Sequence, residues 1–116
     1  MRLESNKVRI AHMLDACRQA LSFAEGRTFP DLQQDLPVQH LLIRNLEIIG
    51  EAASRLSTDL RNAHGEIPWG KIIGMRNYLI HAYFDVDIEL VWRTVTEAVP
   101  ELVTQLESIS RQLNTQ

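Results

Sequence analysis

Apolar residues recur at intervals of three and four along almost the whole chain, and this helical periodicity constrains the fold more than any other feature. The pattern is clear near the N-terminus, where one helical stripe would carry Ile10, Leu14, Cys17, Leu21 and Ala24. No segment shows the alternation of apolar and polar residues that is typical of a half-buried strand. A chain of 116 residues is long enough for one hydrophobic core but not for two. We therefore expect a single all-α domain over residues 1–116, built as an antiparallel bundle of four to five helices.

Capping residues and prolines divide the periodic pattern into segments. Ser5 suits the N-cap of the first helix, and Gly26 suits its end. The two prolines within residues 27–37 indicate a connector with one short helical turn. The pattern then predicts the longest helix of the chain over residues 38–63.

The second half of the chain divides in the same way. Residues 64–65 end the long helix, and the next helix is predicted over residues 68–83. Residues 85–87 then break the chain and cap a last helix that runs to about Leu113. Pro100 lies inside that helix and predicts a kink or a division.

The expected long helix has an apolar arc too wide for a single contact, comprising Leu41, Leu42, Leu46, Ile48, Ile49, Ala52, Ala53, Leu56 and Leu60. We therefore expect two of its sides to be buried, either in the centre of one chain or with one side against a second subunit. Gly50 and the neighbouring alanines permit a close approach of another backbone.

The same helix carries a polar line formed by Arg44, Glu47, Glu51 and Arg55. The favoured interpretation is a solvated face whose internal ion pairs contribute little. Alternatively, the line borders a cleft in which Glu51 tethers Arg76.

Charge and composition exclude several classes of protein. The formal net charge of −3 argues against electrostatic binding of nucleic acid by the whole surface. The acidic excess lies in residues 81–116, which hold six acidic and two basic groups, so a local cationic groove elsewhere stays compatible with the sequence. A single cysteine excludes an intramolecular disulfide and a Cys-x-x-Cys metal site. No apolar run exceeds three residues and no secretory signal is present, so we expect a cytoplasmic protein without a membrane partner.

Segment 74–83 is the one place where chemically versatile side chains gather, because it holds Arg76, Asn77, Tyr78, His81 and Tyr83. On a helix Asn77 and His81 share a face, so the amide is expected to orient the imidazole. Arg76 and His81 diverge by roughly 140° on a regular helix, so two chains meeting across a dyad would combine them more easily than one.

These residue types suit cleavage of an RNA phosphodiester without a metal or other cofactor. An imidazole can take a proton from the 2′-hydroxyl or give one to the leaving 5′-oxygen. A guanidinium can hold the phosphate and stabilise its growing charge. Tyr78 is expected to pack rather than react, while His12 and His40 are expected to be surface or core-edge residues.

The motif Arg76-Asn77-x3-His81-x-Tyr83 resembles the RX4HXY motif of the HepT-like family within the HEPN superfamily. Four further blocks resemble that family in the same order: residues 46–53, residues 66–69 with 74–77, residues 83–92, and residues 99–102. The similarity extends from about residue 38 to residue 106.

The resemblance implies an all-α HEPN fold that dimerises and places two motifs in a shared cleft. It also implies the toxin of a type VII toxin–antitoxin pair, a metal-independent ribonuclease that cleaves tRNA or mRNA. Arg76 and His81 would be the catalytic pair and Asn77 the supporting residue. The implied partner is a minimal nucleotidyltransferase antitoxin that silences the toxin by AMPylation of Tyr83.

The sequence is also compatible with a second class of function. In that interpretation the chain is a non-catalytic helical binding module that docks a nucleotidyltransferase or a nucleotide. The acidic charge balance favours this alternative, because RNA affinity generally depends on cationic surface. The complete set of motif residues favours the ribonuclease, because binding alone does not require the histidine.

Overall fold

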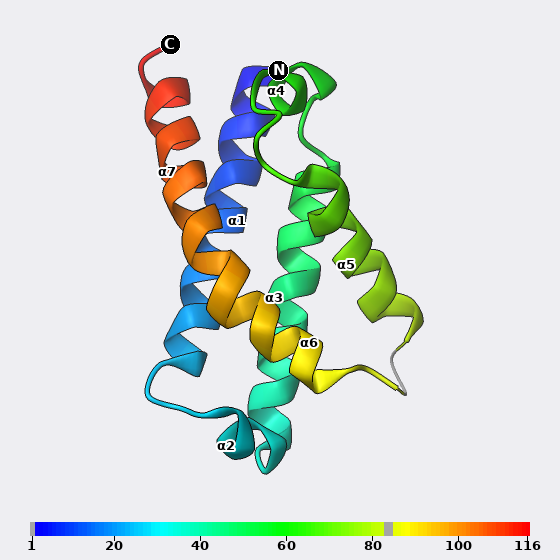
Figure 1. The fold of residues 1–116 in the computed structure, drawn as a ribbon. Coiled ribbons are helices and arrows are strands. Elements are labelled where there is room, and N and C mark those ends of the chain that lie inside the picture. The colour runs from blue at the N-terminus through cyan, green and yellow to red at the C-terminus, as the bar shows by residue number, and fades with distance from the viewer. Residues whose placement is uncertain (1, 83–84) are drawn as a thin grey trace.

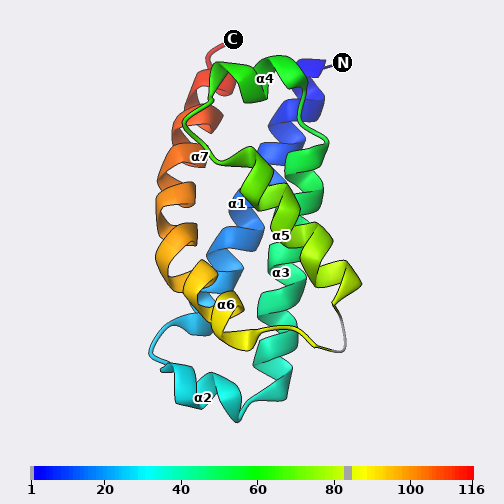
Figure 2. The same cartoon turned by 45° about the vertical axis from the view of Figure 1, so that its right-hand side comes forward.

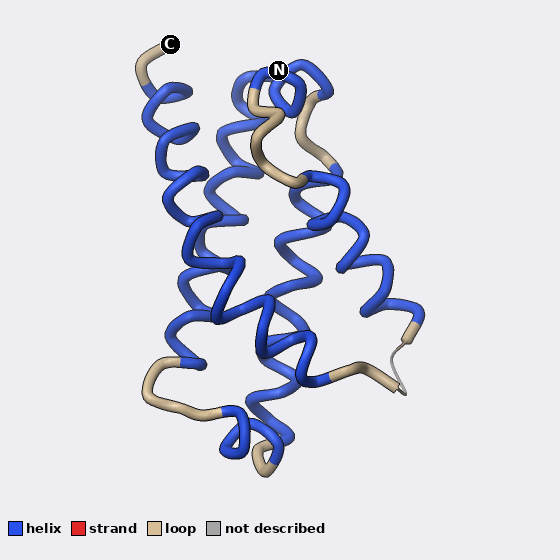
Figure 3. Tube along the Cα trace, viewed as in Figure 1, coloured by secondary structure: helices blue, strands red, loops and turns tan. Residues whose placement is uncertain are grey.

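The structure is a computed structural model that describes residues 2–82 and 85–116. Within these ranges it is helical without strands, as Figure 3 shows along the trace. The elements are α1 (Arg2–Ala24), α2 (Phe29–Gln33), α3 (Leu36–Ser54), α4 (Thr58–Ala63), α5 (Trp69–His81), α6 (Ile88–Arg93), the π-helical segment η1 (Thr94–Ala98) and α7 (Val99–Asn114). The predicted all-α class is confirmed.

Four of these helices form the antiparallel bundle, in the spatial order α7, α1, α3 and α5 (Figure 1). Helix α3 packs against α1 on one side and α5 on the other, while α7 covers the far side of α1. The short α2 and α4 close opposite ends of the bundle (Figure 2). Both sides of α3 are thus covered within one chain, as expected for a central core helix, although Leu41 of its predicted apolar arc is 40% exposed.

The first helix differs from the prediction at its start and agrees with it at its end. Helix α1 begins at Arg2, so Ser5 lies inside the helix and is not its N-cap. Its interior position is tolerable because serine in a helix costs only a fraction of a kcal/mol, roughly 0.5 relative to alanine. After Ala24 the chain turns at Gly26, whose φ of 74° lies in the left-handed region that favours glycine.

The predicted long helix over residues 38–63 is wrong, because it is divided into α3 and α4. Ser57 caps α4 by accepting a hydrogen bond from the Leu60 N–H at 3.2 Å. The buried side chain of Asn6 on α1 holds the cap from both sides: its Nδ2 donates to Ser57 Oγ, and its Oδ1 accepts from the Ser57 N–H, each at 3.0 Å. A contact with α1, which is the longest helix at 23 residues, therefore stabilises the break.

The remaining boundaries lie close to the predicted ones. Thr28 and Asp31 form a capping box on α2, the predicted short turn. Helix α5 ends at His81, and Asp87 caps α6 by accepting from the Leu90 N–H. Pro100 does not break the last helix sharply; it follows the π-helical segment η1, which marks the predicted division.

The core is a single cluster that includes nearly every predicted apolar position of α1. Ile10, Cys17 and the neighbouring Met13 are fully buried, and Leu21 is partly buried against the cluster. None of the described helices is long and apolar enough to cross a membrane.

Cys17 gives a test of this packing. Burial raises the pKa of its thiol to about 12, and the thiolate is the form that reacts with alkylating agents. We expect iodoacetamide to leave the folded protein unmodified at pH 8 and to label it once in urea, as measured by intact mass. Rapid labelling of the folded protein would show that α1 is not packed as described.

Candidate functional site

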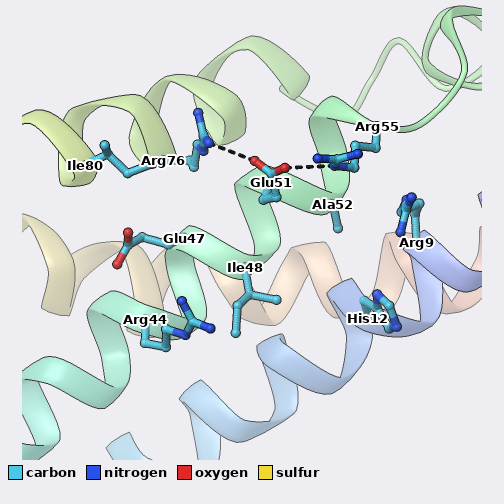
Figure 4. A pocket seen from close by; sticks show the side chains of 10 residues that line it. All are labelled: Arg9, His12, Arg44, Glu47, Ile48, Glu51, Ala52, Arg55, Arg76 and Ile80. Carbon is cyan, nitrogen blue, oxygen red and sulfur yellow. Dashed lines mark hydrogen bonds and ion pairs between the residues drawn. The ribbon is translucent and has the colours of Figure 1, made fainter.

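A charged groove of about 310 Å³ runs over the faces of α1, α3 and α5 (Figure 4). The polar line predicted on α3 forms its centre, with α1 at one edge and α5 at the other. The lining side chains are Arg9, His12, Arg44, Glu47, Ile48, Glu51, Ala52, Arg55, Arg76 and Ile80. The alternative interpretation of the polar line, that it borders a cleft, is therefore the one that the structure shows.

Glu51 connects two arginines in this groove. Its Oε2 lies 2.9 Å from Arg76 Nη2, and its Oε1 accepts a hydrogen bond of 2.8 Å from Arg55 Nε. The hydrogen bond from Arg55 and the positive charge of Arg76 hold the pKa of the Glu51 carboxyl below its usual range. Glu51 is thus an ionised tether for Arg76 near neutral pH.

Arg76 is held from two directions. Besides the ion pair with Glu51, its Nη1 donates a hydrogen bond of 3.0 Å to the Asn77 Oδ1. A guanidinium carries five N–H donors, and the side chain of Arg76 is 33% exposed, so donors are left for an anionic ligand. The sequence assigned the amide of Asn77 to the imidazole of His81, and this is wrong: the amide contacts Arg76.

His81 contacts Asn77 through the backbone instead. Its Nδ1 lies 2.7 Å from the Asn77 carbonyl oxygen. Because a carbonyl oxygen only accepts, this hydrogen bond requires the proton on Nδ1. In the neutral ring Nε2 then carries the lone pair, which is the state that a general base needs.

One chain does not bring Arg76 and His81 to the same point. Arg76 borders the groove, whereas His81 is exposed at the C-terminal end of α5 and is not among the groove-lining residues. No hydrogen bond or ion pair joins the two among the described residues. The predicted divergence of the two side chains is confirmed. Tyr83, the proposed modification site, lies outside the described residues.

The predictions for Tyr78, His40 and His12 agree with the structure. Tyr78 is structural as expected, since its hydroxyl accepts a hydrogen bond of 2.9 Å from the Asp87 N–H. His40 is exposed, in accord with its assignment as a surface residue. His12, assigned to the same class, is exposed as well, and it lines the groove together with Arg9. Their i, i+3 spacing on one face of α1 was the available signal for this pair.

Gly50 makes the arrangement of α3 and α5 possible. A Cβ atom at this position would overlap the Cβ of Arg76 and lie 3.0 Å from the Ile72 carbonyl oxygen. The predicted close approach of backbones is confirmed, and the approaching helix is α5 of the same chain. The described residues include no group of three or more His, Cys, Asp or Glu placed to hold a metal ion.

Comparison with known proteins identifies relatives across most of the chain. The profile of the family described as Ribonuclease HepT-like matches residues 13–109. A Thermococcus cleftensis protein named "Probable ribonuclease HepT" is 37% identical over 92% of this chain and 97% of its own length. A Caldanaerobacter subterraneus subsp. tengcongensis protein named "Putative RNase" is 37% identical over 86% of this chain and 89% of its own. No solved structure matches the chain.

Substitution of Gly50 tests whether α3 and α5 pack closely at this position. We expect Gly50→Ala to lower the free energy of unfolding by about 1–3 kcal/mol, because the added methyl group overpacks the contact between α3 and α5. Urea denaturation measures the change. Gly74→Ala is the matched control: apart from its chain neighbours and the backbone of its own helix, no atom lies within 4 Å of its Cβ position. Alanine favours a helix over glycine by about 0.5–1 kcal/mol. Equal effects of the two substitutions would contradict the packing argument.

Proposed function

This chain belongs to the HepT-like ribonuclease family, and on that premise we propose that it is a metal-independent endoribonuclease that cleaves tRNA or mRNA. The observation that carries the proposal is the state of the motif residues. Arg76 is oriented by Glu51 and Asn77 with donors to spare, and His81 has its Nδ1 engaged so that Nε2 can exchange a proton.

The reaction follows from these two groups. The 2′-oxygen attacks the adjacent phosphorus, and the bond from phosphorus to the 5′-oxygen breaks, which leaves a 2′,3′-cyclic phosphate and a free 5′-hydroxyl. His81 Nε2 removes the proton of the 2′-hydroxyl or protonates the leaving oxygen. The Arg76 guanidinium stabilises the charge that develops on the phosphoryl oxygens.

We propose that the active species is a homodimer. The reaction needs a base at one oxygen and an acid at another, and each chain supplies one motif histidine. In one chain Arg76 and His81 also lie apart. Two copies of α5 facing each other across a dyad would supply both histidines and both arginines to one phosphate.

The biological role that we propose is that of the toxin in a type VII HEPN–nucleotidyltransferase toxin–antitoxin system in the cytoplasm. The partner would be a minimal nucleotidyltransferase antitoxin. It would transfer AMP from ATP to the hydroxyl of Tyr83, with release of pyrophosphate. An anionic nucleotide two positions from His81 would repel an RNA phosphate and fill its space, which supports this mode of silencing.

A non-catalytic binding module is the second candidate. Its support is the ion pair of Arg76 with Glu51, which neutralises the motif arginine, together with the net charge of −3. In this alternative the helices dock a nucleotidyltransferase or a nucleotide, and removal of His81 would not change the function.

Cleavage of total tRNA in EDTA distinguishes the two functions. We expect wild-type protein to produce 2′,3′-cyclic phosphate ends, and Arg76→Ala and His81→Ala each to slow cleavage by about 10²–10⁴-fold. His40→Ala and Arg93→Ala are matched controls, since both residues are exposed and lie outside the groove. Absence of cleavage by wild type and mutants alike would favour the binding module.

Modification by the partner has its own readout. On incubation with the nucleotidyltransferase and ATP, we expect intact mass to increase by at least one AMP unit and RNA cleavage to stop. Tyr83→Phe should stay unmodified. Tyr78→Phe keeps Tyr83, the other of the chain's two tyrosines, and should be modified like wild type. Modification of Tyr83→Phe would exclude Tyr83 as the site.

A further inference from the structure

The α1 edge of the groove has no part in the reaction described above. Figure 4 shows Arg9 and His12 on α1, across the central helix α3 from Arg76 and Ile80 on α5. Both residues precede the range matched by the family profile, which begins at residue 13. The structure, and not the profile match, places them in the groove.

Some charged side chains of the groove have ion-pair partners and others have none. It contains four arginines and two glutamates, and Glu51 already pairs with Arg55 and Arg76. Among the described residues, no hydrogen bond or ion pair occupies the side chains of Arg9, His12 or Arg44. The α1 side of the groove is therefore cationic, with Glu47 as the remaining carboxylate.

Arg9 also has a buried donor without an acceptor. Its Nε lies out of contact with solvent and has no hydrogen-bond partner. An unsatisfied buried donor is costly, and a ligand oxygen entering the groove would remove that cost. Nε and one Nη form the fork that binds two oxygens of one phosphate.

The shape of the groove fits a strand rather than a single ion. Arg55, the C-cap of α3, follows Arg44 by eleven positions, which corresponds to about 16 Å along the helix axis. A nucleic acid strand carries one phosphate per roughly 3.4 Å of helical rise, so the groove extends beyond one phosphate. Ile48 and Ala52 between the charges provide an apolar floor against which a sugar or base can pack.

We propose that Arg9 and His12 of α1, with Arg44 of α3, bind a phosphodiester of single-stranded RNA next to the one held by Arg76. This inference rests on the proposed ribonuclease function and assigns its substrate-positioning site. The three residues position the strand and take no part in proton transfer.

Binding of a short oligouridylate tests the site separately from cleavage. In the cleavage-deficient His81→Ala background, we expect Arg9→Gln to weaken binding about tenfold. It should also reduce the slope of log affinity against log salt by about 0.7, the value for one phosphate contact on a single strand. With His81 intact, Arg9→Gln should raise KM and leave kcat nearly unchanged.

Two variants serve as controls. Arg18→Gln makes the same charge change on the opposite face of α1, where Arg18 pairs with Glu107, and it should leave the salt slope unchanged. Glu47→Gln removes the free carboxylate of the groove, and it should tighten RNA binding. Equal effects of Arg9→Gln and Arg18→Gln would reduce the site to a general charge effect and overturn the proposal.

The remaining outcomes separate this inference from the proposed function. If wild type cleaves RNA and Arg9→Gln has an unchanged KM and salt slope, only the positioning site is wrong. If the slope changes as expected while wild type does not cleave, only the ribonuclease is wrong. If light scattering shows that Arg9→Gln loses a dimer while circular dichroism is unchanged, the groove is an interface between copies and the proposal fails.

Discussion

The close contact between α3 and α5 at Gly50 is the constraint on which the site depends. Because Gly50 has no side chain, the Cβ of Arg76 can occupy the space beside the α3 backbone. Glu51 directly follows Gly50. Because the two helices lie so close here, the Glu51 carboxylate reaches the guanidinium of Arg76. Loss of the contact would separate the charged line on α3 from the motif helix, and the groove would lose its α5 edge.

Helix geometry also explains why one chain holds only part of a catalytic site. Residues five positions apart on a helix point in different directions, so α5 directs Arg76 into the groove and leaves His81 at the helix end. Asn77 serves both, with its side chain on Arg76 and its carbonyl on His81. The motif is therefore a rigid unit whose two reactive groups are each oriented but not combined, which is consistent with a site shared between two copies.

Local signals predicted the helical class, the cap at Asp87, the turn at Gly26 and the disturbance before Pro100, because each depends on residues within one turn. They failed at residues 55–57, where no proline or glycine interrupts the periodic pattern. The break there depends on Asn6, which is 51 positions away in the sequence and binds the cap of α4 from α1. The apolar periodicity of one segment cannot predict a contact with a residue so distant in the sequence.

Spacing and residue type along the chain are sufficient to predict the all-helical fold, the wide apolar arc of the central helix and the identity of the motif residues. The partners of the polar side chains, in contrast, depend on how the helices pack. The tertiary structure placed Glu51 on Arg76, moved the Asn77 amide from the imidazole to the guanidinium, and brought Arg9 and His12 into the groove. A polar side chain can reach several alternative partners, so the partner that it contacts depends on which helices approach and how closely.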